Sequence, residues 1–181
     1  MQEIDYNKIQ EELLAFTKTE VSNFLTEHPN EVFYAFAFDC NAEYAEVNLC
    51  FNTESAFSSL LDESQSGKYK ASYQSEEQIN ELKYNTGDWE YQSFSTHYAL
   101  SEDELFGDED DHDEDGDDEN EDGELNNIIT ENLLLHFSKT LVEFTRSEEF
   151  QKIPKTPDFK VFCIDHDEDL DEAELRLSSL T

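Results

Sequence analysis

An acidic stretch between Ser101 and Glu124 constrains the fold of this chain more than any other feature. It contains sixteen Asp and Glu residues and no Lys or Arg. Neighbouring carboxylates at this density repel one another, and few apolar side chains are available to bury, so a packed structure is not expected there. We predict a single domain over residues 1–181 with an acidic low-complexity insertion at residues 107–124, present as a disordered loop.

The rest of the chain is acidic as well. The formal net charge of the 181 residues is −35, and outside the stretch thirty acidic residues still face eleven basic ones. Such a field opposes contact with DNA, RNA and anionic lipid, and it attracts basic proteins or multivalent cations. A simpler explanation also exists, since acidity keeps a protein soluble without serving any other purpose.

The cysteines and the first residues indicate a cellular compartment. Cys40, Cys50 and Cys163 are odd in number and form no CxxC pair, which argues against a disulfide framework and against a zinc site. The first residues lack the basic and apolar regions of a secretory signal, and no apolar run is long enough to cross a bilayer. We expect a cytoplasmic protein without membrane contact.

Hydrophobic periodicity predicts the first half of the fold. Asp5 to Glu27 reads as an amphipathic helix, which Pro29 ends. Val32–Phe38 is apolar on both alternating faces, as in a central strand, and Glu46–Phe51 alternates like a half-buried antiparallel neighbour. Two helices are predicted next, one capped by Asn52 or Thr53 and ending near Gly67, the other following the capping box Ser75–Gln78.

The second half predicts further helices and one more strand: a short helix after the capping box Ser101–Glu104, a long helix at Leu125–Phe150, a strand at Asp158–Asp165 and a helix at Glu172–Leu180. The long helix is apolar on two faces, so it is either sandwiched in the core or packed against another chain. This order predicts an α+β fold, with a small mixed or antiparallel sheet covered by helices.

An aromatic-rich segment lies in mid-chain and contains Tyr84, Trp89, Tyr91, Phe94 and Tyr98. It has few aliphatic residues, and we expect irregular chain around the core with at most one short strand. A base-stacking platform needs interleaved basic residues, and this segment offers only Lys83. We interpret the aromatic residues as core anchors, with a partner-facing patch as the second interpretation.

Two dense oxygen clusters raise the question of a metal. Asp111, Asp113, Asp115 and Asp122 follow the spacing of a calcium-binding loop, with Gly116 at the turn. The closing residue is Asp instead of the usual Glu, however, and so acidic a run matches the pattern by chance. The second cluster spans Asp165–Asp169, which we interpret as a solvated strand end followed by helix-capping carboxylates. We predict no specific metal and no cofactor.

No motif of an enzyme is present. The five histidines pair with no nucleophile motif, and no GxSxG, HExxH, Walker or GxGxxG sequence occurs. We therefore predict a protein without catalytic residues.

Several short motifs in a fixed order resemble the uncharacterised bacterial domain-of-unknown-function family 4303: Phe33–Phe38, Asn52–Glu54, Trp89–Tyr91, Leu141–Phe150 and Val161–Asp165. The resemblance spans nearly the whole chain, although the long acidic insertion departs from the family pattern. Domains of this kind tend to occur beside polymorphic-toxin loci. The resemblance therefore implies an immunity protein and no catalytic residues.

We hypothesise a non-enzymatic binding protein, an immunity protein that neutralises a cognate toxin by occluding a basic surface. The partner would be a basic protein, with no nucleic acid involved. The expected contact residues are Asp108, Glu109, Asp110, Asp111, Asp113, Glu114, Asp115, Asp117, Asp118, Asp165, Asp167 and Asp169.

Three alternatives stay open at this point. The chain could be an acidic nucleic-acid mimic that sequesters a nucleic-acid-binding protein, a weak divalent-cation binder, or a domain whose insertion only aids solubility. The sequence does not determine the partner's identity or the oligomeric state.

Overall fold

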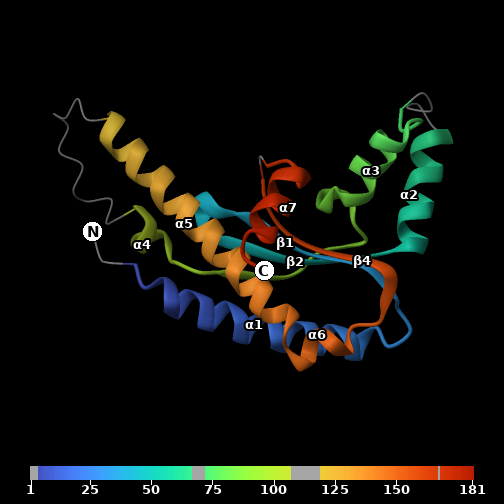
Figure 1. The fold of residues 1–181 in the computed structure, drawn as a ribbon, viewed down its shortest axis with the longest axis horizontal. Coiled ribbons are helices and arrows are strands. Elements are labelled where there is room, and N and C mark those ends of the chain that lie inside the picture. The colour runs from blue at the N-terminus through green and yellow to red at the C-terminus, as the bar shows by residue number, and fades with distance from the viewer. Residues whose placement is uncertain (1–3, 67–71, 107–118, 167) are drawn as a thin grey trace.

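The computed structural model describes residues 4–66, 72–106, 119–166 and 168–181 (Figure 1). In chain order its elements are α1 (Tyr6–Glu27), β1 (Phe33–Asn41), the 3₁₀ turn η1 (Ala42–Tyr44), β2 (Glu46–Thr53), α2 (Glu54–Ser66), α3 (Glu76–Tyr84), the 3₁₀ turn η2 (Thr86–Asp88), β3 (Tyr91–Tyr98), α4 (Glu102–Phe106), α5 (Glu119–Thr145), α6 (Glu148–Lys152), β4 (Lys155–Asp165) and α7 (Leu170–Ser178).

The described strands form a four-stranded mixed sheet in the order β3-β2-β1-β4. β1 pairs antiparallel with β2 and parallel with β4, and β2 pairs antiparallel with β3. Helices cover the sheet, and the α+β prediction is confirmed. The parallel pairing depends on the long crossover from β1 to β4, since parallel neighbours cannot be joined by a tight turn.

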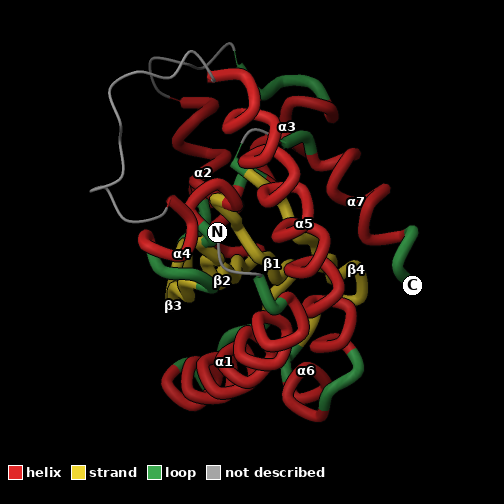
Figure 2. The backbone as a smooth tube through the Cα atoms, turned by 90° about the vertical axis from the view of Figure 1, so that its left-hand side faces the viewer, coloured by secondary structure: helices red, strands yellow, loops and turns green. Residues whose placement is uncertain are grey.

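β1 is buried on both faces, as its apolar pattern predicts. Phe33, Phe36 and Phe38 belong to a large cluster with α1 and α5. Ala35 and Ala37 belong to a second cluster with α2, α3 and the segment around Trp89. Figure 2 shows α1 and α6 on one side of the sheet and α2 and α3 on the other. The sheet therefore separates two hydrophobic clusters.

α1 begins where its sequence signal indicates. The Oδ1 atom of Asp5 accepts hydrogen bonds from the backbone N–H groups of Asn7 and Lys8, both at 3.1 Å, and caps the helix. The buried stripe of the helix consists of Ile9, Leu13, Thr17, Val21 and Phe24. This stripe docks on the larger cluster, beside α5.

The predicted helix Leu125–Phe150 is two helices in the structure. α5 begins at Glu119, inside the stretch that we predicted as a loop, and the remainder of that loop, residues 107–118, lies outside the described residues. α5 ends at Thr145, and α6 starts anew after Ser147, whose side chain accepts from the N–H of Phe150. α5 contacts both α1 and α7, so it is sandwiched within the domain.

The aromatic mid-chain segment is more regular than predicted. Residues Tyr91–Tyr98 form the edge strand β3, which has a register shift opposite Leu49 and Phe51 and a left-handed Ser93 (φ 48°). Such irregularity hides the strand from periodicity analysis. Trp89 is only 4% exposed and acts as a core anchor, whereas Tyr98 is 63% exposed and does not.

Phe137 of α5 provides a stability test. Its ring is fully buried in the larger cluster, so Phe137→Ala leaves a cavity and is expected to lower the free energy of unfolding by about 3–5 kcal/mol. The matched control is Ile128→Ala on the same helix, where the side chain is 52% exposed and the expected change is within about 0.5 kcal/mol. Urea denaturation measures both, and equal losses would contradict this packing.

His97 of β3 predicts a pH dependence. Its ring lies 5.0 Å from the ring of Phe16, and burial lowers the pKa of His97 below its ordinary value of 6.5. The folded chain therefore disfavours the charged form of the ring. As the pH falls below about 6.5, the unfolded chain binds a proton at this histidine more readily than the folded chain does, so the free energy of unfolding decreases. Relative to the variant His97→Gln, the wild-type free energy of unfolding should decrease between pH 7.5 and pH 5.5. A constant difference between the two proteins over that range would contradict the assignment.

Candidate functional site

Segments that are distant in the sequence meet where β1 and β4 end. Because these strands are parallel, their carboxyl ends lie at the same edge of the sheet, with Cys40 paired to Asp165. The turn η1 follows β1 there, and the backbone N–H of Ala42 donates a hydrogen bond to Asp165 Oδ1 at 2.9 Å. The pairing of Glu46 with Tyr98 brings the start of β2 and the end of β3 to the same edge.

The elements on both sides of the acidic stretch also lie at this end. The N–H of Ala99 donates to the carbonyl of Ala45 at 2.8 Å, which fixes the chain leading into α4 next to η1. Leu105 of α4 and Ile129 of α5 are buried in the same hydrophobic cluster. Figure 1 shows α4 and the first turns of α5 together, on the opposite side of the molecule from α2.

The carboxylates gathered at this edge define a surface that we call the acidic end. Its described members come from η1, β2, α4 and α7 and are Glu43, Glu46, Asp103, Glu104, Asp169, Asp171 and Glu172. Asp39, near the end of β1, lies close to two carboxylates, Glu46 and Asp165. Burial raises the pKa of Asp39, and although a hydrogen bond with Thr86 and the charge of His166 oppose this, the charges of Glu46 and Asp165 add to it. Burial is therefore the main cause of the raised pKa of Asp39, and the two neighbouring carboxylates add to it.

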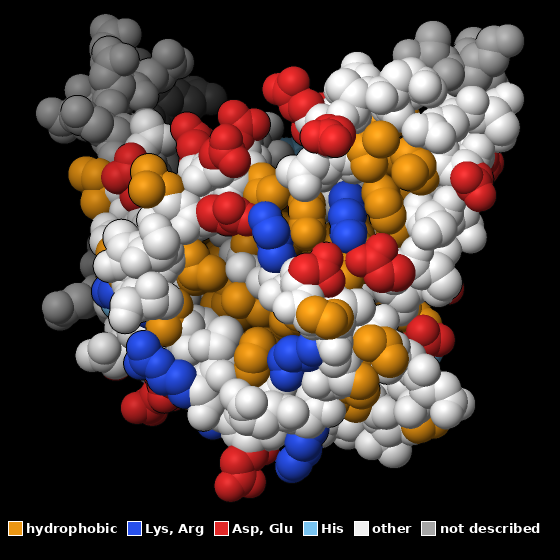
Figure 3. Space-filling model, turned by 45° about the vertical axis from the view of Figure 1, so that its right-hand side comes forward, with side chains coloured by type: hydrophobic (Ala, Val, Ile, Leu, Met, Phe, Trp, Pro, Cys, Tyr) orange, Lys and Arg blue, Asp and Glu red, His pale blue; other side chains and the backbone are white. Residues whose placement is uncertain are grey.

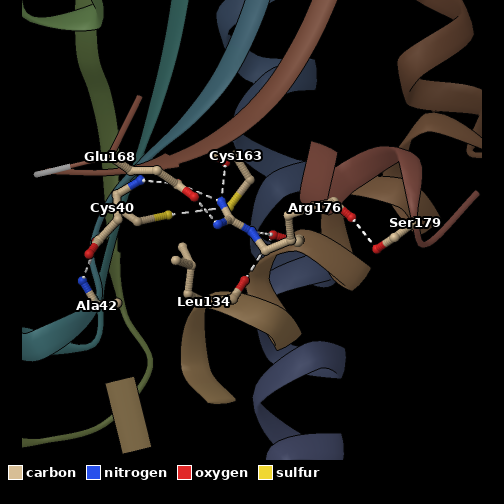
Figure 4. A network of polar contacts seen from close by, with 9 residues as sticks. Cys40, Ala42, Leu134, Cys163, Glu168, Arg176 and Ser179 are labelled. Atoms are coloured by element: carbon tan, nitrogen blue, oxygen red, sulfur yellow. Dashed lines mark hydrogen bonds and ion pairs between the residues drawn. The ribbon is translucent and has the colours of Figure 1, made fainter. Parts of the chain in front are cut away.

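Arg176 of α7 joins three elements behind this surface (Figure 4). Its guanidinium forms a two-pronged ion pair with Glu168, donates to the carbonyl of Cys163 at 2.6 Å and donates to Ser138 Oγ at 2.9 Å. Glu168 in turn accepts from the N–H of Asp165 at 3.1 Å. Burial alone would lower the pKa of Arg176, and the hydrogen bond and charge of Glu168 raise it overall. The arginine thus neutralises one carboxylate and fixes α7 to β4 and α5.

Two cysteines lie against this network. The sulfur atoms of Cys40 and Cys163 are 3.6 Å apart, and both side chains are buried. Burial raises the pKa of Cys40 well above its usual range. At Cys163 burial acts in the same direction, but hydrogen bonds with Cys40 and Ser138 and the charge of Arg176 outweigh it and lower the pKa. The pair packs in the core and presents no sulfur atom to a substrate at the surface.

The predicted contact residues that the structure describes differ in exposure and in hydrogen bonding. Asp165 is half-buried and bonded to the backbone of Ala42, whereas Asp169 is exposed and stands at the N-cap of α7. Asp167 lies outside the described residues, as do Asp108, Glu109, Asp110, Asp111, Asp113, Glu114, Asp115, Asp117 and Asp118. Asp165 ends its strand and Asp169 precedes α7, as the sequence interpretation placed them. Asp165 is however half-buried and not solvated, and the side chain of Asp169 makes no capping hydrogen bond.

The metal candidates fall mainly in the same part of the chain. Asp111, Asp113 and Asp115 lie outside the described residues, and Asp122 is placed in α5 only as backbone. Within the part of the chain that the structure describes, no group of three or more His, Cys, Asp or Glu side chains is arranged to bind a metal ion. Over those same residues, no helix combines the length and the apolar character needed to span a membrane.

Lysines of the opposite end are engaged with local partners. Three of them lie over aromatic rings, with Nζ at 4.5 Å from the ring centre of Tyr34 for Lys83, 4.7 Å from Tyr84 for Lys160 and 4.2 Å from Phe150 for Lys155. Lys83 also pairs with Glu54 at 2.7 Å, and Lys160 with Glu174 at 2.6 Å. Figure 3 shows such cationic side chains between apolar ones, with carboxylates beside them.

Sequence reasoning missed Arg176, and it named Tyr98 only within a group interpreted first as core anchors and second as a partner-facing patch. A single arginine in a short acidic helix belongs to no sequence motif. Its presence in so acidic a segment is the one signal that could have drawn attention to it. The exposure of Tyr98 depends on β3 ending at the sheet edge, which no local pattern reveals.

Comparison with known protein families matches residues 13–180 to the family described as Domain of unknown function (DUF4303). The match covers nearly the entire chain, and the chain belongs to this family. No curated protein and no solved structure was found to match it.

The ion pair behind the acidic end predicts a large stability effect. Arg176→Met leaves Glu168, whose side chain is 12% exposed, without its cation, and it should lower the free energy of unfolding by about 3–5 kcal/mol. The double variant Arg176→Met with Glu168→Gln removes the uncompensated charge and should recover much of the loss. Guanidinium denaturation measures both proteins. A loss below about 1 kcal/mol in the single variant would contradict the role of the pair.

Proposed function

We propose that this DUF4303 protein is a non-enzymatic binding protein whose acidic end docks on a basic surface of a partner protein. The supporting observation is that carboxylates of η1, β2 and α4 lie where the strands end. Glu43 follows β1 directly, Glu46 pairs with Asn41 and with Tyr98, and Glu104 lines the same hollow as Tyr98. Lys83 and Lys160 are paired with carboxylates of their own neighbourhood, and Lys155 lies over the ring of Phe150. A concentrated negative potential speeds the encounter with a basic surface and orients it.

The finer proposal is that the partner is a cognate toxin and that this protein confers immunity to it. Toxins that act on nucleic acids or nucleotides need a cationic cleft. An acidic protein surface competes for such a cleft, because it presents the same sign of charge as the polyanionic substrate. Inhibition is then stoichiometric occlusion, in which the folded scaffold fills the cleft and no bond is made or broken.

The first experiment identifies the partner and measures its association rate. Proteins captured from the native cell by the full chain are identified by mass spectrometry, and the purified partner is then examined by stopped flow. Raising the ionic strength from about 0.01 M to about 1 M shortens the Debye length from about 30 Å to about 3 Å, so the association rate should fall by about tenfold or more. A rate indifferent to ionic strength would contradict the proposal.

Charge variants locate the surface. Glu43→Gln combined with Asp169→Asn removes two exposed charges from the acidic end, and we expect slower association and a weaker dependence on salt. The matched control, Glu27→Gln combined with Glu148→Gln, removes the same charge from exposed positions at the ends of α1 and α6. Equal effects of the two pairs would show that net charge acts without a preferred surface.

A further inference from the structure

A groove with aromatic walls opens beside the acidic end, at the end of β3. It consists of two adjoining hollows of about 490 Å³ and about 440 Å³ that share Tyr98, Leu100 and Ser101. Tyr44 of η1 lines the second hollow, and both tyrosines are among the exposed large hydrophobic residues that the structure describes, at 63% for Tyr98 and 49% for Tyr44. Leu105, which is buried, forms part of the apolar lining.

Carboxylates surround this apolar surface. Asp5, Glu12 and Glu104 line the first hollow, and Glu46 lines the second. Each of them already has a local partner, which fixes its position: Asp5 caps α1, Glu12 pairs with Lys8 at 3.7 Å, Glu46 accepts from Asn48 at 2.7 Å, and Glu104 accepts from Ser101 at 2.8 Å. These bonds are made by Oδ1 of Asp5, Oε1 of Glu12 and Glu46, and Oε2 of Glu104.

We propose that this groove binds an arginine or lysine side chain, presented by a basic segment of the partner protein. The proposal rests on the proposed function and adds the subsite at which contact is made. A cationic side chain has an apolar stem that fits Leu100 and Leu105 and a charged head that is attracted both to tyrosine rings and to carboxylates. Arginine fits best, because its planar guanidinium stacks on an aromatic face and still donates to carboxylates at its edge.

The charge around the groove selects this occupant over others. An anionic ligand would meet the four rim carboxylates, with Lys8 as the one base in the lining of the described hollows. A purely apolar segment would remove water from the carboxylates and offer no hydrogen bonds in its place, and this desolvation costs free energy. A cation avoids both penalties, and it is also the group that the field of the acidic end draws toward this surface.

The test uses the full chain and a triarginine peptide as the probe. Titration followed by amide NMR should give saturable shifts at Tyr98, Leu100 and Ser101. Tyr98→Ala should weaken binding about threefold to tenfold, because the ring face is lost, whereas Tyr98→Phe keeps the ring and should stay within about twofold of the wild type. The matched control is Leu175→Ala, an exposed apolar residue on α7 whose removal should leave the affinity unchanged.

The outcomes separate this inference from the function on which it rests. Suppose that the peptide binds in a salt-dependent way, but the largest NMR shifts lie outside the groove or Tyr98→Ala has unaltered affinity. Either result overturns the groove and leaves the proposed function standing. If the chain fails to bind the peptide at every ionic strength tested, the groove is overturned. That result also contradicts an acidic end that attracts basic segments. Circular dichroism melting of each variant confirms that the fold is intact.

Discussion

The parallel pairing of β1 with β4 is the constraint on which the rest of the structure depends. It brings the carboxyl ends of two strands, separated by more than a hundred residues of chain, to one edge of the sheet, where Ala42 and Asp165 form a hydrogen bond. β1 can occupy this central place because it is buried on both faces, with phenylalanines toward α1 and α5 and Tyr34, Ala35 and Ala37 toward α2 and α3. The acidic end is a consequence of this topology, since the carboxylates follow the strands to the edge where the strands stop.

Much of the fold was predictable from local signals. α1 begins at Asp5 and α3 begins with the capping box of Ser75, as predicted, and the two-faced apolar run at Phe33–Phe38 is the central strand. The break between α5 and α6 was missed because the apolar spacing continues across Ser147. β3 was allowed for only as one short strand within irregular chain, because its register shift and the left-handed Ser93 disturb the alternation that marks a strand.

The sequence predicted the charge of the candidate site but not which residues form it or where it lies on the fold. Composition alone predicts an anionic surface, and the sequence pointed to Asp165 and Asp169 as part of it. It could not show that the backbone N–H of Ala42 donates a hydrogen bond to Asp165, whereas Asp169 stays exposed. Both facts depend on how strands that are distant in the sequence pair. Nor could it show that Arg176 neutralises Glu168, or that Tyr98 ends an edge strand beside Glu46. These contacts arise from packing, and no motif encodes them.

The central claim is that the acidic end, and not the charge of the chain as a whole, is the surface that meets the partner. Hydrogen–deuterium exchange of the full chain with and without its captured partner tests this most directly. The account predicts slower exchange on binding at residues 41–46, 98–106 and 168–172, with little change in α6 or at the start of β4. Protection concentrated in α6 and the start of β4, with exchange at the acidic end unaltered, would contradict it.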